Sequence, residues 1–464
     1  MTLHRVSRFV LAIGLLAVPA QAHAQAFGLN EIGTCALNKA FANTGAPCDD
    51  ASTVYWNPGA IPKTRGLSVL AGLAVIPLKG DFSQDTTFRT FDTDIETALV
   101  PHVFATYRAN RLTYGLGVYV PYGLTSQWGD DFPGRFAALK ASLQTIYVQP
   151  NVAFQITEGW SVGLGPVIGH SSVELIQAID LSQQRTSASA TAPIFGQIGI
   201  PKRTEFARAK LEGDAMAYGV NVGFHGRLSN DWQIGGRFLS QLYFKYDDAD
   251  ATFEQRPTGL VLAANNPLGA PAGTPVDALP PLTAQFTGTG ALTAQKVKTQ
   301  IMHPAQVQVG VGYTGLANTT ISVDYAWVGW KSFKELPVDF QGGAPDRLLF
   351  EDYNNTSSIR VGADYRFTSG AALRGGFAAA ASAAPDVTVT PLLPEQDRTY
   401  WTIGGGYPIT SRFTIDGAYM RIHTPGRRGR LDERASRAQT ADQLNNGSYT
   451  LDANIFSLSL KASL

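Results

Sequence analysis

Apolar and polar residues alternate along most of the chain after about residue 66. One stretch carries its apolar side chains on a single strand face: Leu112, Tyr114, Leu116, Val118, Val120 and Tyr122. The opposite face is small or polar and carries Thr113, Gly115, Gly117 and Tyr119. Side chains of a β-strand point alternately to its two faces, so a repeat of two residues predicts strands. Helical spacing is rare, and we expect an all-β chain.

The polar face carries charge where a soluble β-sandwich would have its core. Asp324 lies between the apolar Val323 and Tyr325, and Lys461 shares a face with three serines of the last predicted strand. An apolar face toward lipid and a polar face toward the lumen is the arrangement of a transmembrane β-barrel. A soluble exported protein of many strands is the alternative.

The pattern predicts about fourteen strands, and an even number suits a bacterial barrel. Their approximate ranges are 67–78, 99–108, 111–122, 143–157, 160–179, 208–228, 232–249, 291–316, 319–334, 353–368, 371–383, 398–410, 413–423 and 447–464. Tight connections, such as 157–159 and 229–231, alternate with long ones, the longest of which includes 257–281. Short periplasmic turns and long outer loops explain this alternation. We therefore predict an antiparallel transmembrane β-barrel over residues 66–464.

The first residues have the features of a signal peptide. Arg5 and Arg8 precede the apolar run 9–20, and Ala22 and Ala24 flank one position, as signal peptidase prefers. A run of about twelve apolar residues is too short to cross a bilayer as a helix, which needs about 20. We expect residues 1–24 to be removed and the mature chain to lie in the bacterial outer membrane; an uncleaved membrane anchor is the alternative.

Composition excludes several classes of protein. The 464 residues include 37 Lys and Arg against 37 Asp and Glu, without a long basic run, which argues against nucleic-acid binding. A hydrophobic share of 44% argues against disorder. Two cysteines and scattered histidines form no metal site, and no G-x-S-x-G, H-E-x-x-H or P-loop motif is present. We expect neither an enzyme nor a cofactor.

An arginine-rich tract lies in the predicted outer loop between the last two strands. Its members are Arg427, Arg428, Arg430, Arg434 and Arg437. Arginine binds phosphate in a bidentate manner, so the tract could contact lipopolysaccharide. The alternative is a solvated loop in which Asp432 and Glu433 balance the arginines.

The residues before the first strand have a different character. They include Phe27-Gly28-Leu29-Asn30-Glu31, Asp49-Asp50-Ala51 and Asn57-Pro58-Gly59-Ala60, and the barrel region adds Pro121-Tyr122-Gly123-Leu124 and Trp330-Lys331-Ser332-Phe333. These stretches resemble the FadL/TodX (OMPP1) family of outer-membrane transporters for long-chain fatty acids and aromatic hydrocarbons. The resemblance implies that residues 25–65 form a small helical hatch that plugs the lumen. It also implies passive uptake of hydrophobic small molecules.

The resemblance also implies where the ligand goes. In the family, a ligand reaches a pocket beside the N-terminus and leaves sideways through a gap made by a kinked third strand. The pocket and hatch residues would be Phe27, Leu29, Asn30, Asn57 and Pro58, and the kink candidates are Gly115, Gly117 and Pro121. Proline lacks an amide and glycine weakens pairing, so either could break the ladder. Alternatively, the glycines make room for the hatch.

Selectivity is where the chain departs from the family. Fatty-acid members place a basic residue late in the fifth strand and another before the tenth, whereas here 173–177 read Val-Glu-Leu-Ile-Gln and 350–352 read Phe-Glu-Asp. Nearby acids would repel a carboxylate. Either Lys331 or Lys334 takes over, or the ligand is neutral, and we predict a chiefly apolar pocket beside Phe27 and Leu29.

The remaining expectations concern the cysteines and the partners. Cys35 and Cys48 lie 13 positions apart in an exported segment, where a disulfide forms readily; two free thiols are the alternative. The expected partners are a hydrophobic small molecule, outer-membrane lipids with lipopolysaccharide and the barrel-assembly machinery, for a monomer that binds no nucleic acid. A nonselective aqueous porin is the second functional hypothesis, and an outer-membrane barrel lipase is the third.

Overall fold

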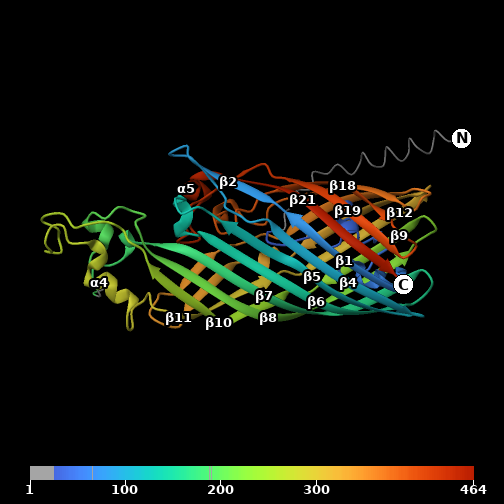
Figure 1. Cartoon of the computed structure of the whole chain (residues 1–464), viewed down its shortest axis with the longest axis horizontal. Helices are drawn as coiled ribbons and strands as arrows, with labels where there is room; N and C mark the ends of the chain where they lie inside the picture. Colours follow the sequence, from blue (N-terminus) through green and yellow to red (C-terminus); the bar gives the residue numbers. More distant parts are fainter. Residues whose placement is uncertain (1–25, 65, 188, 190) are drawn as a thin grey trace.

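Fourteen antiparallel strands form the wall of a closed barrel (Figure 1). The computed structural model describes residues 26–464 except 65, 188 and 190. In chain order the wall consists of β1 (Leu67–Ile76), β4 (Ala98–Ala109), β5 (Leu112–Gln127), β6 (Lys140–Gln155), β7 (Trp160–Asp180), β8 (Glu205–Arg227), β9 (Trp232–Leu239) with β10 (Leu242–Gln255), β11 (Gln295–His303) with β12 (Gln306–Leu316), β13 (Thr319–Val328) with β14 (Glu335–Phe340), β15 (Arg347–Phe350) with β16 (Thr356–Arg366), β17 (Ala372–Ala380), β18 (Arg398–Pro408), β19 (Phe413–His423) and β21 (Gly447–Ser463). The barrel closes where β1 pairs with β21, from Ser68 opposite Ser463 to Val75 opposite Phe456.

The alternation of side chains is as the sequence predicts. Leu99 of β4 and Ile403 of β18 are 61% and 58% exposed on the outer surface, whereas Asp324 of β13 and Ser459 of β21 are 1% and 3% exposed on the inside. Such a wall is stable only where lipid replaces water around it. Among the described residues, no helix is both long and apolar enough to span a bilayer.

Four wall strands are not continuous as predicted. The predicted strand 232–249 breaks at residues 240–241, and the predicted strand 291–316 breaks at residues 304–305. The predicted strand 319–334 is regular only to Val328, and the predicted strand 353–368 begins at Thr356. Pro304 lacks an amide to donate to a ladder, and the 3₁₀ turn η7 (Trp330–Ser332) carries the chain into the barrel interior. Backbone pairing shifts at these breaks, and aromatic side chains enter the lumen there.

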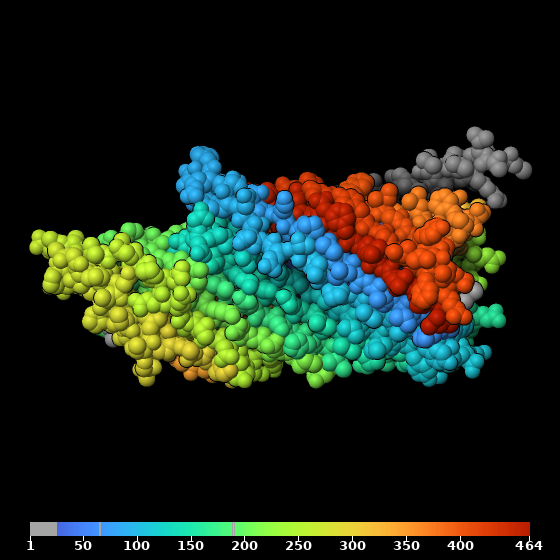
Figure 2. Space-filling model, viewed as in Figure 1, coloured from blue at the N-terminus to red at the C-terminus, as the bar shows by residue number. Residues whose placement is uncertain are grey.

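Tight turns and long loops occupy opposite ends of the barrel. Asn110 and Asn318 adopt left-handed conformations, with φ of 59° and 57°, in two of the tight turns. The long loops carry β2 (Leu78–Gln84), β3 (Thr90–Asp92), β20 (Arg427–Gly429), α4 (Pro280–Thr283), α5 (Ala441–Leu444) and the 3₁₀ turns η2 (Pro133–Phe136), η3 (Leu181–Gln183), η4 (Phe195–Ile198), η5 (Val276–Ala278), η6 (Ala284–Phe286) and η8 (Asp386–Thr388). The loops after β7 and β10 project beyond the rim (Figure 2) and pack around a small core that includes Leu181, Phe195 and Leu282.

The N-terminal segment fills the lumen. Residues 26–64, here called the hatch, contain α2 (Thr34–Asn38), α3 (Thr53–Trp56) and η1 (Pro58–Lys63), and α2 contacts β18 and β19 while η1 contacts β7 and β8. Cys35 and Cys48 form a disulfide, with Cα atoms 6.2 Å apart. The predicted signal peptide, residues 1–24, lies outside the described residues. The hatch is therefore a cross-linked plug against both sides of the barrel.

Candidate functional site

Strand β5 contains one residue more than the stretch of β6 that it pairs with. Tyr119 pairs with Tyr147 and Tyr122 pairs with Thr145, so three steps along β5 oppose two along β6. One extra residue turns every later side chain to the other face of the sheet. Tyr119 and Tyr122 are therefore both buried in the lumen, and the prediction that Tyr122 shares the outer face of Leu116 is wrong.

The wall is interrupted at the same point. In the described residues, the pairing of β4 with β5 ends at His102 opposite Tyr119, while β4 continues to pair with β1. The amide of Leu29 donates to the carbonyl oxygen of Pro121 at 2.9 Å, and the amide of Gly123 donates to the carbonyl oxygen of Phe27 at 3.0 Å. The start of the hatch thus takes the strand edge that β4 leaves unpaired.

Phe27 inserts its ring into a group of aromatic side chains from three parts of the barrel. The ring centroid lies 4.7 Å from Trp330, 5.6 Å from Phe333 and 5.9 Å from both Tyr122 and His303. We call these five residues the Phe27 cluster. All five are buried. The surroundings of Phe27 are chiefly aromatic.

Leu29 and Asn30 follow Phe27 into the lumen. Leu29 is half-buried, and a Cβ atom added to Gly123 would lie 2.9 Å from its Cδ1 atom. Asn30 is buried, and its carbonyl oxygen accepts a hydrogen bond from the amide of Ile32 at 2.7 Å. Leu29 therefore lies beside the interruption in β5, and Asn30 begins the turn toward α2.

Asn57 and Pro58 fasten the hatch to the opposite wall. The Asn57 side chain donates to the carbonyl oxygens of Thr44 at 3.0 Å and Phe224 at 2.9 Å, and its oxygen accepts from the amide of Gly59 at 3.1 Å. A Cβ atom on Gly163 of β7 would lie 2.2 Å from the Pro58 carbonyl oxygen, so only glycine fits there. Both residues thus bind the hatch to β7 and β8.

Gly115 and Gly117 stand in the regular part of β5. They pair with Asn151 and Gln149 of β6 without a shift in register. A Cβ atom on Gly115 would lie 2.7 Å from a methyl carbon of Val54 in the hatch, whereas one on Gly117 would lie 2.7 Å from the Phe104 ring of β4 and 3.2 Å from Val54. The position of Gly115 agrees with the interpretation that it makes room for the hatch, Gly117 makes room chiefly for Phe104, and the interruption of the ladder is beside Pro121.

Polar side chains of the wall hold the hatch from several directions. Asp324 accepts hydrogen bonds from the amides of Thr44 at 2.6 Å and Gly45 at 3.3 Å. Gln149 donates to the carbonyl oxygen of Val54 at 2.8 Å, and Arg237 donates to that of Tyr55 at 3.1 Å. The alternation placed Asp324 inside the barrel, but the sequence carried no signal that it binds the hatch backbone.

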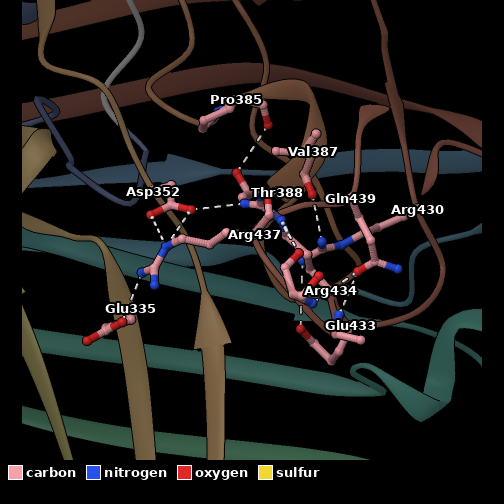
Figure 3. A network of polar contacts seen from close by, with 12 residues as sticks. Glu335, Asp352, Pro385, Val387, Thr388, Arg430, Glu433, Arg434, Arg437 and Gln439 are labelled. Carbon is pink, nitrogen blue, oxygen red and sulfur yellow. Dashed lines mark hydrogen bonds and ion pairs between the residues drawn. The ribbon is translucent and has the colours of Figure 1, made fainter. Parts of the chain in front are cut away.

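The acids before β16 are compensated by arginines from another loop. Arg434 donates to Asp352 at 2.9 Å and Arg437 donates to the same carboxylate at 3.0 Å (Figure 3). Burial raises the pKa of Glu351 to about 8, with Glu433 and Asp352 adding to the shift, so the neutral form of Glu351 predominates at pH 7. The repulsion of a carboxylate that the sequence suggests is therefore weakened at this point.

The two predicted lysine partners lie apart from the Phe27 cluster. Lys331 and Lys334 are exposed, although their neighbours Trp330 and Phe333 are buried in it. The carbonyl oxygen of Lys334 accepts hydrogen bonds from the amides of Glu351 and Asp352, both at 2.8 Å. Through its backbone, Lys334 joins the loop after β13 to the loop before β16.

The arginine-rich tract is engaged within the protein. Arg427 pairs with Asp386 at 2.6 Å, Arg428 pairs with Asp85, and Arg430 donates to the carbonyl oxygen of Val387 at 2.6 Å. Together with the two arginines bound to Asp352, these contacts tie residues 424–446 to three other outer segments. A solvated loop balanced only by its own acids does not describe this arrangement.

A polar vestibule opens at the end of the barrel that carries the tight turns. It has a volume of 660 Å³, and its lining includes Lys39, Lys63, Arg227, Asp364 and Arg366. Lys63 donates to Gln233 at 2.8 Å. The vestibule and the Phe27 cluster lie on different sides of the hatch, because Lys63 ends η1 whereas Phe27 meets the broken part of β5.

Comparison with known proteins now identifies the architecture. Residues 15–463 match the sequence model described as outer membrane protein transport protein (OMPP1/FadL/TodX). The chain belongs to the OMPP1/FadL/TodX family. It is an outer-membrane transport protein, since members of this family are transporters or channels and not enzymes. The resemblance seen in the hatch motifs is thereby confirmed.

Individual FadL/TodX relatives agree over nearly their whole length. A long-chain fatty acid transport protein of Salmonella typhi is 26% identical over 425 residues, which cover 90% of this chain and 92% of the relative. A crystal structure of a Pseudomonas aeruginosa FadL homologue superposes with a TM-score of 0.78 at 19% identity, covering 95% of this chain and all of the other. The toluene transporter TodX of P. putida gives 0.66 at 14% identity, with coverages of 95% and 99%. These structures share the barrel fold.

Proposed function

We propose that this protein carries hydrophobic small molecules, long-chain fatty acids or aromatic hydrocarbons, passively across the outer membrane. The proposal draws on family membership and on relatives named for fatty acid and toluene transport. The single observation that carries it is the insertion of Phe27 into a buried aromatic cluster beside an interruption of the wall. An apolar molecule that replaces Phe27 there meets the same rings.

Binding energy in such a pocket comes from apolar surface removed from water. The gross gain is about 25 cal/mol per Å² of buried apolar area, before the cost of association and of moving Phe27. The segment that carries Phe27 is held to β5 by two backbone hydrogen bonds, and by contacts of the Ala26 backbone with Glu395 and Arg398. Releasing this short segment requires far fewer bonds to break than removing the whole hatch.

A sideways exit beside Pro121 requires fewer contacts to be broken than a route through the lumen. A route straight through the lumen must break the contacts of Asp324, Gln149 and Arg237 with the hatch. A route between β4 and β5 passes where, among the described residues, the two strands exchange no backbone hydrogen bonds beyond Tyr119. We therefore propose that the transported molecule leaves into the lipid through this interruption, once the Phe27 segment moves.

The test restores a continuous β5. Deleting Val120 and replacing Pro121→Val removes the extra residue and supplies the missing amide, so Tyr122 keeps its partner Thr145 while the interruption closes. The matched control, Pro121→Ala, keeps the extra residue. In proteoliposomes the first variant should lose most uptake of a labelled hydrophobic molecule and the control should retain it. Equal uptake by both variants would refute the sideways exit.

A nonselective aqueous porin remains the second candidate, because the polar vestibule shows that water reaches the hatch from one end. We expect the wild-type protein to conduct no ions in planar bilayers, since the hatch fills the lumen. Steady ohmic conductance would favour the porin instead. Contact with lipopolysaccharide, assembly by the barrel-assembly machinery and a monomeric state stay predictions.

A further inference from the structure

Three polar atoms in and beside the Phe27 cluster have no hydrogen-bond partner among the described residues. They are the indole nitrogen Nε1 of Trp330, the hydroxyl of Tyr353 and the ring nitrogen Nε2 of His303. The three side chains are fully enclosed, at 0%, 1% and 0% exposure. Buried donors in proteins are normally paired, because an unmade hydrogen bond leaves the cost of desolvation uncompensated.

Two other hydroxyl groups in the same place are paired. The Tyr147 hydroxyl bonds to Nδ1 of His303 at 2.9 Å, and the Tyr122 hydroxyl accepts from the Gln306 side chain at 2.9 Å. Nε2 of His303 belongs to a ring that is already bonded through Nδ1, whereas Trp330 and Tyr353 have no second polar side-chain atom, so neither of these two side chains makes a hydrogen bond among the described residues. Two donors without partners at one pocket wall suit a molecule that brings an acceptor.

The two donors belong to one rigid unit. Within η7, the Phe333 amide donates to the Trp330 carbonyl oxygen at 2.8 Å, and the Tyr353 amide donates to the Phe333 carbonyl oxygen at 3.1 Å. The Tyr353 ring lies 5.1 Å from that of Phe333 and 6.2 Å from that of Trp330. The Trp330 ring therefore contacts Phe27 directly, and the Tyr353 ring packs against Trp330 and Phe333.

The surroundings of Tyr353 indicate how a bound molecule would be oriented. Tyr353 lies within electrostatic range of four charged residues in the loops of the outer end, Glu351, Glu395, Arg427 and Arg430. Phe27, on the other side of Trp330 and Phe333, reaches toward β5 and the hatch. A bound molecule would then point a polar group toward the outer loops and an apolar body toward the interruption.

We propose that Trp330 Nε1 and the Tyr353 hydroxyl donate hydrogen bonds to a carbonyl or carboxyl oxygen of the transported molecule. This inference rests on the proposed function and names its substrate class: an apolar chain or ring that ends in an oxygen acceptor, rather than a pure hydrocarbon. The donors are neutral, so the acceptor needs no charge. An acid and its methyl ester satisfy both donors, whereas an alkane of the same length leaves them unpaired.

The test compares binding of a long-chain acid, its methyl ester and the alkane of equal length to purified protein in nanodiscs. Binding is measured by displacement of a fluorescent fatty-acid probe. Wild type should bind the acid and the ester at least fivefold more tightly than the alkane. Tyr353→Phe should remove most of this preference with little change for the alkane, because only one hydroxyl is lost.

The matched control is Tyr147→Phe, which removes a hydroxyl from the same aromatic wall that is already bonded to His303. It should keep the preference of wild type for acid and ester over alkane. Trp330→Phe removes the other proposed donor and should likewise reduce the preference for acid and ester. Folding of each variant is checked by its heat-dependent electrophoretic mobility, so a misfolded barrel is recognised before binding is interpreted.

The outcomes separate this inference from the proposed function. If wild type binds all three molecules equally and Tyr353→Phe changes nothing, the acceptor site is wrong while hydrophobic transport stands. If Tyr353→Phe weakens all three equally, the residue only shapes the pocket, and the inference also fails. If none of the three molecules displaces the probe from wild type, the proposed function itself fails.

Discussion

Single residues at the hatch and in the outer loops carry chemistry that the alternation of strands does not reveal. The disulfide of Cys35 and Cys48 lies in the plug, and the ion pairs of Asp352 lie in the outer loops. Each constrains a segment that has little regular secondary structure of its own. Two predictions follow from such residues.

The first concerns the disulfide. Replacing both Cys35→Ser and Cys48→Ser opens a covalent loop of about 14 residues, which contributes on the order of 3 kcal/mol by restricting the unfolded chain. We expect faster hydrogen exchange in residues 34–48 and unchanged exchange in the wall strands. The control is wild type with and without reductant. Identical exchange in the variant and in oxidised wild type would contradict the prediction.

The second concerns Glu351. Its folded pKa of about 8 is above the ordinary value of 4.5, so between these pH values the folded loop keeps a proton that the unfolded loop has lost. Stability therefore falls by up to about 1.4 kcal/mol per pH unit as pH rises through that window, and stays low above it. Glu351→Gln should protect residues 349–355 from hydrogen exchange at pH 9.

The same variant should equal wild type at pH 3, where the carboxyl is protonated in both states. Exchange is compared between the two proteins at each pH, so the chemical effect of pH on exchange cancels. A variant that is less protected than wild type at pH 9 would show that the Glu351 carboxylate is stabilised in the fold.

At the scale of elements, one extra residue in β5 and the outer loop 424–446 define the site. The extra residue turns Tyr122 inward and leaves a strand edge that the start of the hatch binds. The loop 424–446 joins other outer segments through buried and exposed arginines. We expect the buried and the exposed arginines to contribute differently to the stability of the outer loops.

The third prediction compares them. Arg434 is 7% exposed and its partner Asp352 is 28% exposed, whereas Arg437 is 48% exposed. Removing Arg434 breaks a largely buried hydrogen bond between charged groups and costs about 1.5–3 kcal/mol, although Asp352 keeps its contact with Arg437, while an exposed pair contributes about 0–1 kcal/mol. Arg434→Ala should make the outer loops of intact cells much more sensitive to protease. Arg437→Ala should stay close to wild type, and the reverse order would refute this ranking.

At the scale of the whole molecule, the closed ladder and the apolar outer surface determine how the protein behaves. All fourteen strands are joined by backbone hydrogen bonds around the ring, which β1 and β21 close, and the start of the hatch covers the part of β5 that β4 leaves unpaired. Such a barrel is held together cooperatively and needs lipid or detergent around it.

The fourth prediction uses this cooperativity. The mature protein should stay folded in SDS at room temperature and unfold only on boiling, which gives two bands of different electrophoretic mobility. Without lipid or detergent it should precipitate, because side chains such as Leu99 and Ile403 would face water. A monomer that is soluble in plain buffer would contradict the outer-membrane assignment.

The sequence by itself determined the barrel and its orientation of faces. Period-two alternation is local, so residues such as Val323 and Asp324 reveal which side of a strand is apolar without knowledge of its neighbours. Tight turns at Asn110 and Asn318 are local for the same reason, since a left-handed conformation depends on one residue. The hatch motifs likewise lie close together in the chain.

Only the tertiary structure decided the site. Phe27 meets Trp330 and Phe333 about 300 positions away, and Asp352 meets Arg434 from another loop. Even the face of Tyr122 depended on register with β6, because an extra residue in one strand is visible only against its partner. Contacts across a closed barrel depend on which strands become neighbours and in which register, and that information is not present in any single segment.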